Sequence, residues 1–152
     1  MSPPVIHVKD LASDFSQSSL PGSETAIDHG ALFGLTAIKL LIHVLTDGRY
    51  GYFRDELYYL ACGRHLAWGY ADHAPMIGWI ARLALLMGGS LRQLRIFPAV
   101  AGALLISLTV LVAHKLGGRR FAQVLAGLCV LVTPIYLGID SFLSMNAFEP
   151  LF

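Results

Sequence analysis

Three long apolar runs, separated by polar stretches, dominate the pattern of this chain. They cover residues 31–46, 98–116 and 121–139. A helix rises 1.5 Å per residue, so even the shortest run covers roughly 24 Å of a ~30 Å hydrocarbon core. The pattern therefore predicts an all-α membrane protein with about three transmembrane helices.

Residues 47–97 are predicted to form a long external loop that carries amphipathic interfacial helices. A helix over residues 55–66 would place its apolar side chains on one stripe and its charges elsewhere. That distribution is typical of a helix that lies on a membrane. Residues 76–87 form a second apolar segment, which is too short to cross.

The distribution of charge gives mixed evidence on orientation. The turn over residues 114–120 holds three Lys and Arg residues and no acid, which favours the cytoplasmic side. The loop over residues 47–97 has arginines of its own, however. Residues 1–30 lack the basic start and apolar run of a signal peptide, and we expect them to be a disordered cytoplasmic tail.

The composition agrees with a membrane protein. The chain is 55% hydrophobic and only 14% charged, whereas soluble domains carry roughly 25% charged residues. The formal net charge is +1 and no run of Lys or Arg occurs, so nucleic-acid binding is not expected. Cys62 and Cys129 have neither disulfide-framework nor zinc-site spacing.

Two ionisable residues, Lys39 and His43, fall inside the first apolar run and share one helical face. Such residues are costly in a membrane and usually face protein or water. Lys39 has two further interpretations, because its long side chain can reach the interface or pack against neighbouring helices. These residues also favour a transporter fragment, which is a weaker hypothesis than the enzyme and the partner subunit described below.

The chemistry is concentrated in residues 50–79, which hold eight of the sixteen Phe, Tyr and Trp residues together with carboxylates and arginines. Tyr and Trp favour the membrane interface. Arg can bind the phosphate of a lipid carrier, and a carboxylate can deprotonate an acceptor hydroxyl that attacks a sugar. The same residues suit a solvated loop anchored by its charges, and spacing alone does not separate the two.

Residues 52–59 (YFRDELYY) and 63–73 (GRHLAWGYADH) resemble the first external loop of glycosyltransferase family 39. This family includes protein O-mannosyltransferases and bacterial transferases that act on lipid A or core sugars. Further segments follow in the family's order: 95–98 (RIFP), 101–104 (AGAL), 118–120 (GRR) and 144–149 (SMNAFE). The resemblance runs from about Leu35 to the last residue. It departs at Ala74, where relatives commonly have proline.

The resemblance implies a set of site residues. Asp55 corresponds to the first-loop catalytic acid, Glu56 is its companion, and Glu149 corresponds to the acid of the second external loop. Asp55 and Glu149 are also the candidate ligands if a divalent metal takes part, which the sequence leaves open. The residues expected to bind substrate are Arg54, Tyr58, Tyr59, Arg64, His65, Asp72 and His73.

The implied enzyme is a multi-pass protein of the bacterial inner (plasma) membrane. It would move a sugar from a polyprenyl-phosphate donor to a glycan, lipid or protein acceptor on the external face, typically with inversion. Residues 31–152 would form the N-terminal part of its domain, and we expect this part to be inactive alone. The alternative is a small non-catalytic multi-pass protein that acts as a partner subunit.

Overall fold

The computed structural model describes residues 26–152, whose regular secondary structure is entirely helical, as predicted. Residues 1–25, which make up most of the predicted tail, lie outside the described part. The elements are α2 (His29–Thr46), α3 (Arg54–Arg64), α4 (Met76–Leu86), α5 (Leu91–Lys115), α6 (Arg120–Val132), α7 (Pro134–Ile139) and the short 3₁₀ helices η1 (Met145–Ala147) and η2 (Glu149–Leu151).

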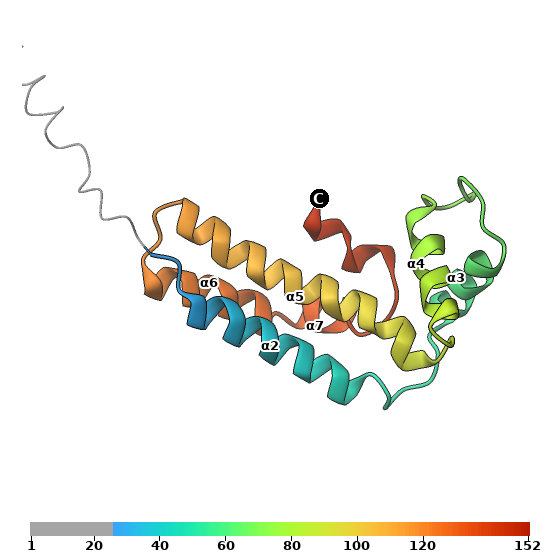
Figure 1. The fold of residues 1–152 in the computed structure, drawn as a ribbon, viewed down its shortest axis with the longest axis horizontal. Helices are drawn as coiled ribbons and strands as arrows, with labels where there is room; N and C mark the ends of the chain where they lie inside the picture. The colour runs from blue at the N-terminus through green and yellow to red at the C-terminus, as the bar shows by residue number, and fades with distance from the viewer. Residues whose placement is uncertain (1–25) are drawn as a thin grey trace, which may run out of the picture.

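Three helices, α2, α5 and α6, lie side by side with alternating direction (Figure 1). Helix α5 packs against both of the others, and α2 also contacts α6. The buried residues between them are Ala31, Leu35, Ile106, Val110 and Leu131. Helices α3 and α4 form a separate layer at the end of the bundle where α2 finishes and α5 begins (Figure 1).

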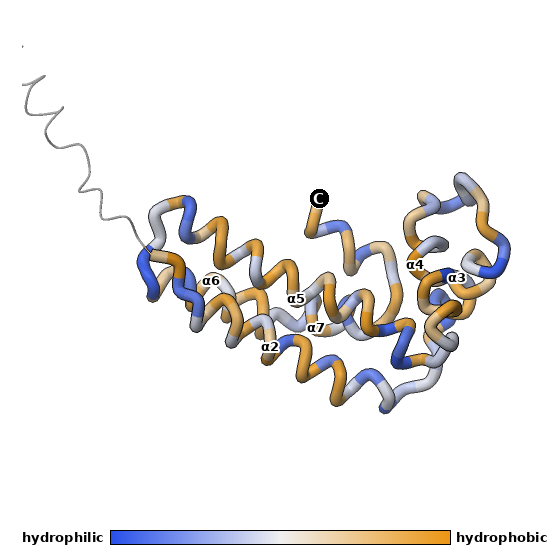
Figure 2. Tube along the Cα trace, viewed as in Figure 1, coloured by the Kyte–Doolittle hydropathy of each residue, from blue (hydrophilic) through white to orange (hydrophobic). Residues whose placement is uncertain are grey.

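Helices α2 and α5 are, by length and composition, the two candidate membrane spans in the described part of the chain. Figure 2 shows apolar residues along the long helices and polar residues gathered toward their ends. The third predicted span, residues 121–139, is instead broken into α6 and α7 at Thr133. Proline has no N–H to continue a helix, and Pro134 therefore starts a new one.

The second span also begins earlier than predicted. Helix α5 starts at Leu91, because Ser90 and Gln93 cap each other's backbone N–H groups, and it continues through Pro98. Arg95 consequently lies on the helix rather than in the loop. The predicted helices over 55–66 and 76–87 are present as α3 and α4, within two residues of the expected bounds at each end.

Helix α3 packs closely on α4 and on the end of the chain. At Gly63 a Cβ atom would lie 2.9 Å from the backbone nitrogen of Arg82, so the two helices approach at the backbone. A second buried cluster joins this pair to α5 and to the segment after α7. Its members are Tyr59, Ile77, Ala81, Ala84, Leu94 and Leu143. The first loop and the C-terminal segment are thereby packed into one unit.

Gly102 on α5 allows another close approach. A Cβ atom there would overlap the carboxylate of Asp140 and lie 2.9 Å from Cε of Lys39. Gly34 on α2, in contrast, has nothing within 4 Å of the corresponding position. The two glycines therefore form a matched pair, one at a crowded site and one at an open site.

We expect Gly102→Ala to lower the free energy of unfolding by about 1–3 kcal/mol, because the added methyl group displaces buried charged groups. Thermal unfolding in detergent measures the effect. Gly34→Ala is the control, and it should raise stability by up to about 1 kcal/mol through helix propensity alone. Equal changes in the two variants would show that the contact at Gly102 is not restrictive.

Candidate functional site

A buried carboxylate organises the start of α3. Glu56 is fully buried on the first turn of this helix. Its Oε1 accepts hydrogen bonds from Nε of Arg95 at 2.9 Å and from the N–H of Leu143 at 3.2 Å. Its Oε2 accepts from Nη2 of Arg95 at 2.9 Å and from the N–H of Phe53 at 2.8 Å. Both oxygens are therefore fully engaged within the protein.

The Arg95 guanidinium also fixes the link between α2 and α3. Nη1 donates to the carbonyl oxygens of Asp47 at 2.7 Å and Tyr50 at 3.3 Å, and Nη2 donates to that of Gly51 at 2.8 Å. The rigid fork of donors on an arginine suits this use. A single side chain on α5 thus holds the segment that leads into the first-loop acids.

Asp55 lies next to Glu56 in the chain but in a different environment. Its side chain is 41% exposed. Its only ion pair among the described residues joins Oδ1 to Nε of Arg54 at 3.4 Å, and the Arg54 side chain is 94% exposed. Exposed pairs of this kind contribute only about 0–1 kcal/mol, so this contact is easily exchanged for another. Of the two adjacent acids, Asp55 is the one that a substrate can reach.

Tyrosines of α3 surround His73 from the segment before α4. The hydroxyl of Tyr58 donates to Oδ1 of Asp72 at 2.8 Å, and this hydrogen bond raises the pKa of Tyr58. The buried His73 ring lies 5.6, 5.3 and 4.6 Å from the rings of Tyr58, Tyr59 and Tyr70. Burial raises the pKa of Tyr59. The structure therefore brings four of the predicted substrate-binding residues into one cluster.

The hydrogen bonds of His73 define its tautomer. Nδ1 lies 2.9 Å from the carbonyl oxygen of Ala74, which can only accept, so Nδ1 carries a proton. Nε2 faces Sγ of Cys62 and Oδ1 of Asp72, both at 3.8 Å. Cys62 and His73 thus form part of the packing between α3 and α4.

Arg64 and His65 lie apart from this cluster, at the C-terminal end of α3. Both are exposed, and neither side chain makes a hydrogen bond or ion pair with another described residue. The backbone carbonyl oxygen of His65 accepts a hydrogen bond from the hydroxyl of Tyr70 at 3.2 Å. Their side chains are therefore free to contact a ligand outside the folded chain.

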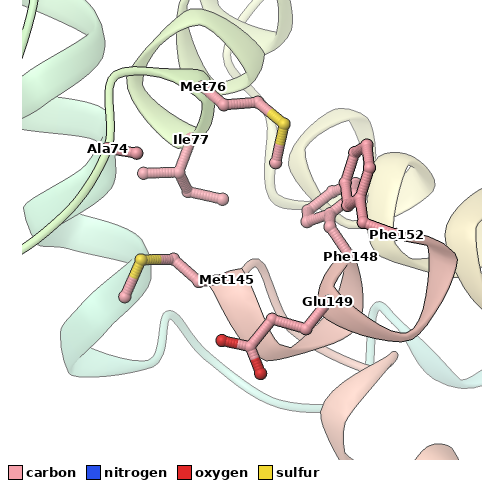
Figure 3. Close-up of a pocket in the computed structure, with 7 residues that line it drawn as sticks. All are labelled: Ala74, Met76, Ile77, Met145, Phe148, Glu149 and Phe152. Carbon is pink, nitrogen blue, oxygen red and sulfur yellow. The ribbon is translucent and has the colours of Figure 1, made fainter.

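Glu149, the predicted second-loop acid, lines an apolar pocket of about 190 Å³ (Figure 3). The pocket lies between the start of α4 and the 3₁₀ helices, and Glu149 is its only charged lining residue. The other residues that line it are Ala74, Met76, Ile77, Met145, Phe148 and Phe152. Asp55 does not line this pocket.

The resemblance offered Asp55 and Glu149 as candidate ligands for a divalent metal. Within residues 26–152, no three His, Cys, Asp or Glu side chains come together in a way that could hold a metal ion. Asp55 and Glu149 thus belong to no such group of three among the described residues.

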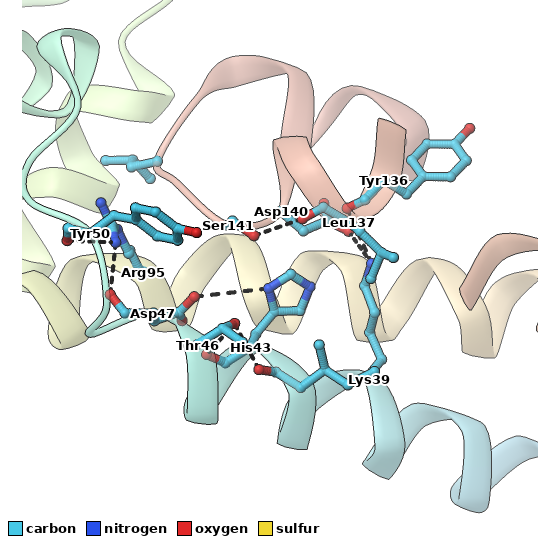
Figure 4. Close-up of polar contacts among 12 residues, drawn as sticks. Lys39, His43, Thr46, Asp47, Tyr50, Arg95, Tyr136, Leu137, Asp140 and Ser141 are labelled. Carbon is cyan, nitrogen blue, oxygen red and sulfur yellow. Dashed lines mark hydrogen bonds and ion pairs between the residues drawn. The ribbon is translucent and has the colours of Figure 1, made fainter. Parts of the chain in front are cut away.

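Buried charges continue into the helical bundle (Figure 4). Nζ of Lys39 lies 2.8 Å from the carboxylate of Asp140 and donates to the carbonyl oxygen of Tyr136 at 3.1 Å. His43, one turn further along α2, is buried and lies 3.9 Å from Asp47. Lys39 thus packs against a neighbouring segment, which is the second of the two interpretations that the sequence allowed for its side chain.

Asp47, just beyond the end of α2, is a buried acid with a perturbed ionisation. Burial raises its pKa to about 6, the nearby Arg95 guanidinium opposes this rise, and Glu56 adds to it. His43 on α2 is a further ionisable neighbour, with Nδ1 3.9 Å from Oδ1 of Asp47. The folded state therefore holds the proton of the Asp47 carboxyl more tightly than the unfolded state does. As the pH rises from the pKa of Asp47 in the unfolded chain, 3.8, to its pKa in the folded protein, about 6, the free energy of unfolding falls.

We therefore expect Asp47→Asn to gain stability over the parent at neutral pH. The gain should shrink by about 1 kcal/mol between about pH 7.5 and about pH 5. Thermal or denaturant unfolding in detergent at both pH values checks this. Parallel pH curves for the parent and the variant would show that Asp47 does not titrate differently in the folded state.

Comparison with known proteins adds evidence that is independent of the geometry. Residues 72–149, just over half of the chain, match the sequence profile of the dolichyl-phosphate-mannose-protein mannosyltransferase family. The chain belongs to this family. The matched range includes Asp72, His73 and Glu149, and it begins after Asp55. No curated protein and no solved structure gives a significant match.

In this mannosyltransferase family member, two contacts were not foreseen from the sequence. Arg95 stands in the RIFP segment, which indicated family membership but not its ion pair with Glu56. Asp140 ends the last apolar run, and Lys39 lies in the first. An isolated base within one apolar run and an isolated acid directly after another are candidates for mutual pairing, and the sequence shows both.

Proposed function

We propose that the chain supplies the first-loop and second-loop acids of an integral membrane glycosyltransferase. The enzyme moves a sugar from a polyprenyl-phosphate donor to a glycan, lipid or protein acceptor. The observation that carries this proposal is the exposed Asp55 beside the fully buried Glu56 at the end of the helical bundle. Family membership supports the glycosyltransferase class, and α2 and α5 support a membrane location.

In the proposed reaction Asp55 is the general base. Its carboxylate takes the proton of the acceptor hydroxyl while that oxygen attacks the anomeric carbon from the face opposite the phosphate. The bond from the anomeric carbon to the phosphate oxygen breaks, and polyprenyl phosphate leaves with the bonding electrons. One such displacement inverts the anomeric centre.

The remaining site residues bind and orient the substrates. The exposed guanidinium groups of Arg54 and Arg64 offer bidentate hydrogen bonds to the donor phosphate. Glu149 adds negative charge beside its apolar pocket, which favours a sugar centre with oxocarbenium character. The cluster of Tyr58, Tyr59, Asp72 and His73 forms one wall of the site, and the exposed His65 contacts the substrates from the end of α3.

The proposed orientation follows from the short turn between α5 and α6. This turn contains Lys115, Arg119 and Arg120 without an acid, which favours the cytoplasmic side. Helices α3 and α4, at the other end of the bundle, then lie at the external face of a bacterial inner (plasma) membrane, which the protein crosses several times (Figure 1).

A transfer assay tests the proposal. Membranes that contain the protein expressed from its own gene are incubated with radiolabelled polyprenyl-phosphate hexoses and pentoses, and a strain without the gene is the control. Gene-dependent label in a glycan, lipid or protein product supports the proposal. If immunoblotting detects the protein but no donor gives such a product, the proposal is wrong and a non-catalytic partner subunit is favoured.

A further inference from the structure

The segment that carries Glu149 does not continue a helix of the bundle. After α7 ends at Ile139, residues 140–144 form no regular helix, and η1 and η2 follow. This segment turns back beside α5, and the chain ends near the middle of the bundle (Figure 1). A stretch without internal helical hydrogen bonds needs other contacts to fix its position.

The first such contact lies at Asp140, immediately after α7. Its carboxylate pairs with Lys39 at 2.8 Å, and both side chains are almost completely buried. Lys39 also binds the carbonyl oxygen of Tyr136, one turn earlier in α7. Gly102 of α5 leaves the space that the pair occupies. The end of α7 is thus attached to α2 across the face of α5 (Figure 4).

The second contact lies at Leu143, at the other end of the same stretch. Its N–H donates to Oε1 of Glu56 at 3.2 Å, and its side chain is fully buried in the cluster between α3, α4 and α5. Glu56 itself is fixed by Arg95. The stretch is therefore attached to the first loop through the acid that adjoins Asp55.

We propose that Lys39 and Glu56 are positioning residues. The Lys39–Asp140 ion pair and the Glu56–Leu143 hydrogen bond hold both ends of residues 140–144, and so set where Glu149 and its pocket lie relative to α4 and Asp55. For Glu56 this replaces the catalytic role expected from the sequence. The catalytic meaning of the arrangement rests on the proposed function, but the position of the segment does not.

Removal of one charged partner and removal of both should have different consequences. A lone buried charge strongly destabilises a protein, whereas loss of both partners costs much less. A pair that only fills buried space should therefore be replaceable by two neutral side chains without further effect. A pair that positions the segment should not be replaceable in this way, because the neutral groups no longer attract each other.

Cross-linking across the pocket measures the position of the segment. Met76 on α4 and Phe148 before η2 line the same pocket, and Met76→Cys with Phe148→Cys can be joined by a short bis-maleimide in native membranes. The background is Cys129→Ser, because Cys129 is exposed whereas Cys62 is buried. Into this protein are introduced Lys39→Met, Asp140→Asn and the two together, and thermal stability is measured in parallel.

We expect the parent to cross-link and each single variant to lose thermal stability and most of the cross-linked product. The double variant should regain most of the thermal stability, but its cross-linking should stay low. Lys115→Met, an exposed lysine at the far end of α5, is the matched control and should change neither quantity.

Three results would overturn the proposal. The first is full cross-linking in the single variants, and the second is cross-linking that returns together with stability in the double variant. The third is a parent that does not cross-link, because the segment would then not face α4. The assay requires no sugar transfer, so failure of the proposed function leaves its outcome unaffected.

Discussion

Asp55→Asn is expected to lower the rate of sugar transfer by about 10²- to 10⁴-fold, the contribution typical of a general base. Asparagine keeps the size of the side chain but cannot accept the proton of the acceptor hydroxyl. Because proton transfer occurs only in the transition state, kcat should fall while the KM for the donor stays close to the parental value. Transfer kinetics in membranes with a labelled polyprenyl-phosphate sugar provide the measurement.

Asp47→Asn is the matched control, since it makes the same chemical change at a buried acid that lies just beyond α2. It should transfer sugar at the parental rate. Both variants should insert into membranes at parental abundance, because Asp55 is exposed and Asp47→Asn removes a carboxylate whose charged form is disfavoured by burial. Parental kcat in Asp55→Asn would mean that another group takes the proton, and Glu149 would be the next candidate.

The helical elements could largely be predicted from the sequence. Apolar runs and stripes located α2, α3 and α4 within two residues, because burial in lipid or against a neighbouring helix requires that periodicity. The break at Thr133 was missed, although Pro134 was visible, because hydropathy averages over a run and does not detect one lost hydrogen bond. The early start of α5 was missed because its first turns are polar.

The candidate site was only partly predictable. The pattern around Asp55 and Glu56 drew attention to both acids, but nothing local distinguishes the exposed one from the buried one. That difference depends on Arg95, which is 39 positions away from Glu56, and on the backbone of Leu143. The Lys39–Asp140 pair likewise joins the first apolar run to the last. Periodicity reports which face of a helix is buried, and it does not report which partner lies opposite.

Arg95→Met should destabilise the protein by about 3–5 kcal/mol, because it leaves the Glu56 carboxylate buried without a compensating charge. The carbonyl oxygens of Asp47, Tyr50 and Gly51 would lose a donor at the same time. Native proteins are stable by only about 5–15 kcal/mol, so the variant should also be depleted from membranes. Denaturant unfolding in detergent and quantitative immunoblotting measure the two effects.

Arg92→Met is the control, since Arg92 lies one turn earlier on α5 and is exposed. A loss no larger than in this control would show that the buried pair contributes little. Arg95→Met combined with Glu56→Met removes the unpaired charge and should recover part of the lost stability. Recovery should be incomplete, because the N–H groups of Phe53 and Leu143 then lack an acceptor, at about 1–3 kcal/mol each. The carbonyl oxygens that Arg95 contacts also stay without their donor. Incomplete recovery would therefore show that the Arg95–Glu56 pair stabilises the protein through its backbone hydrogen bonds as well as through its charges.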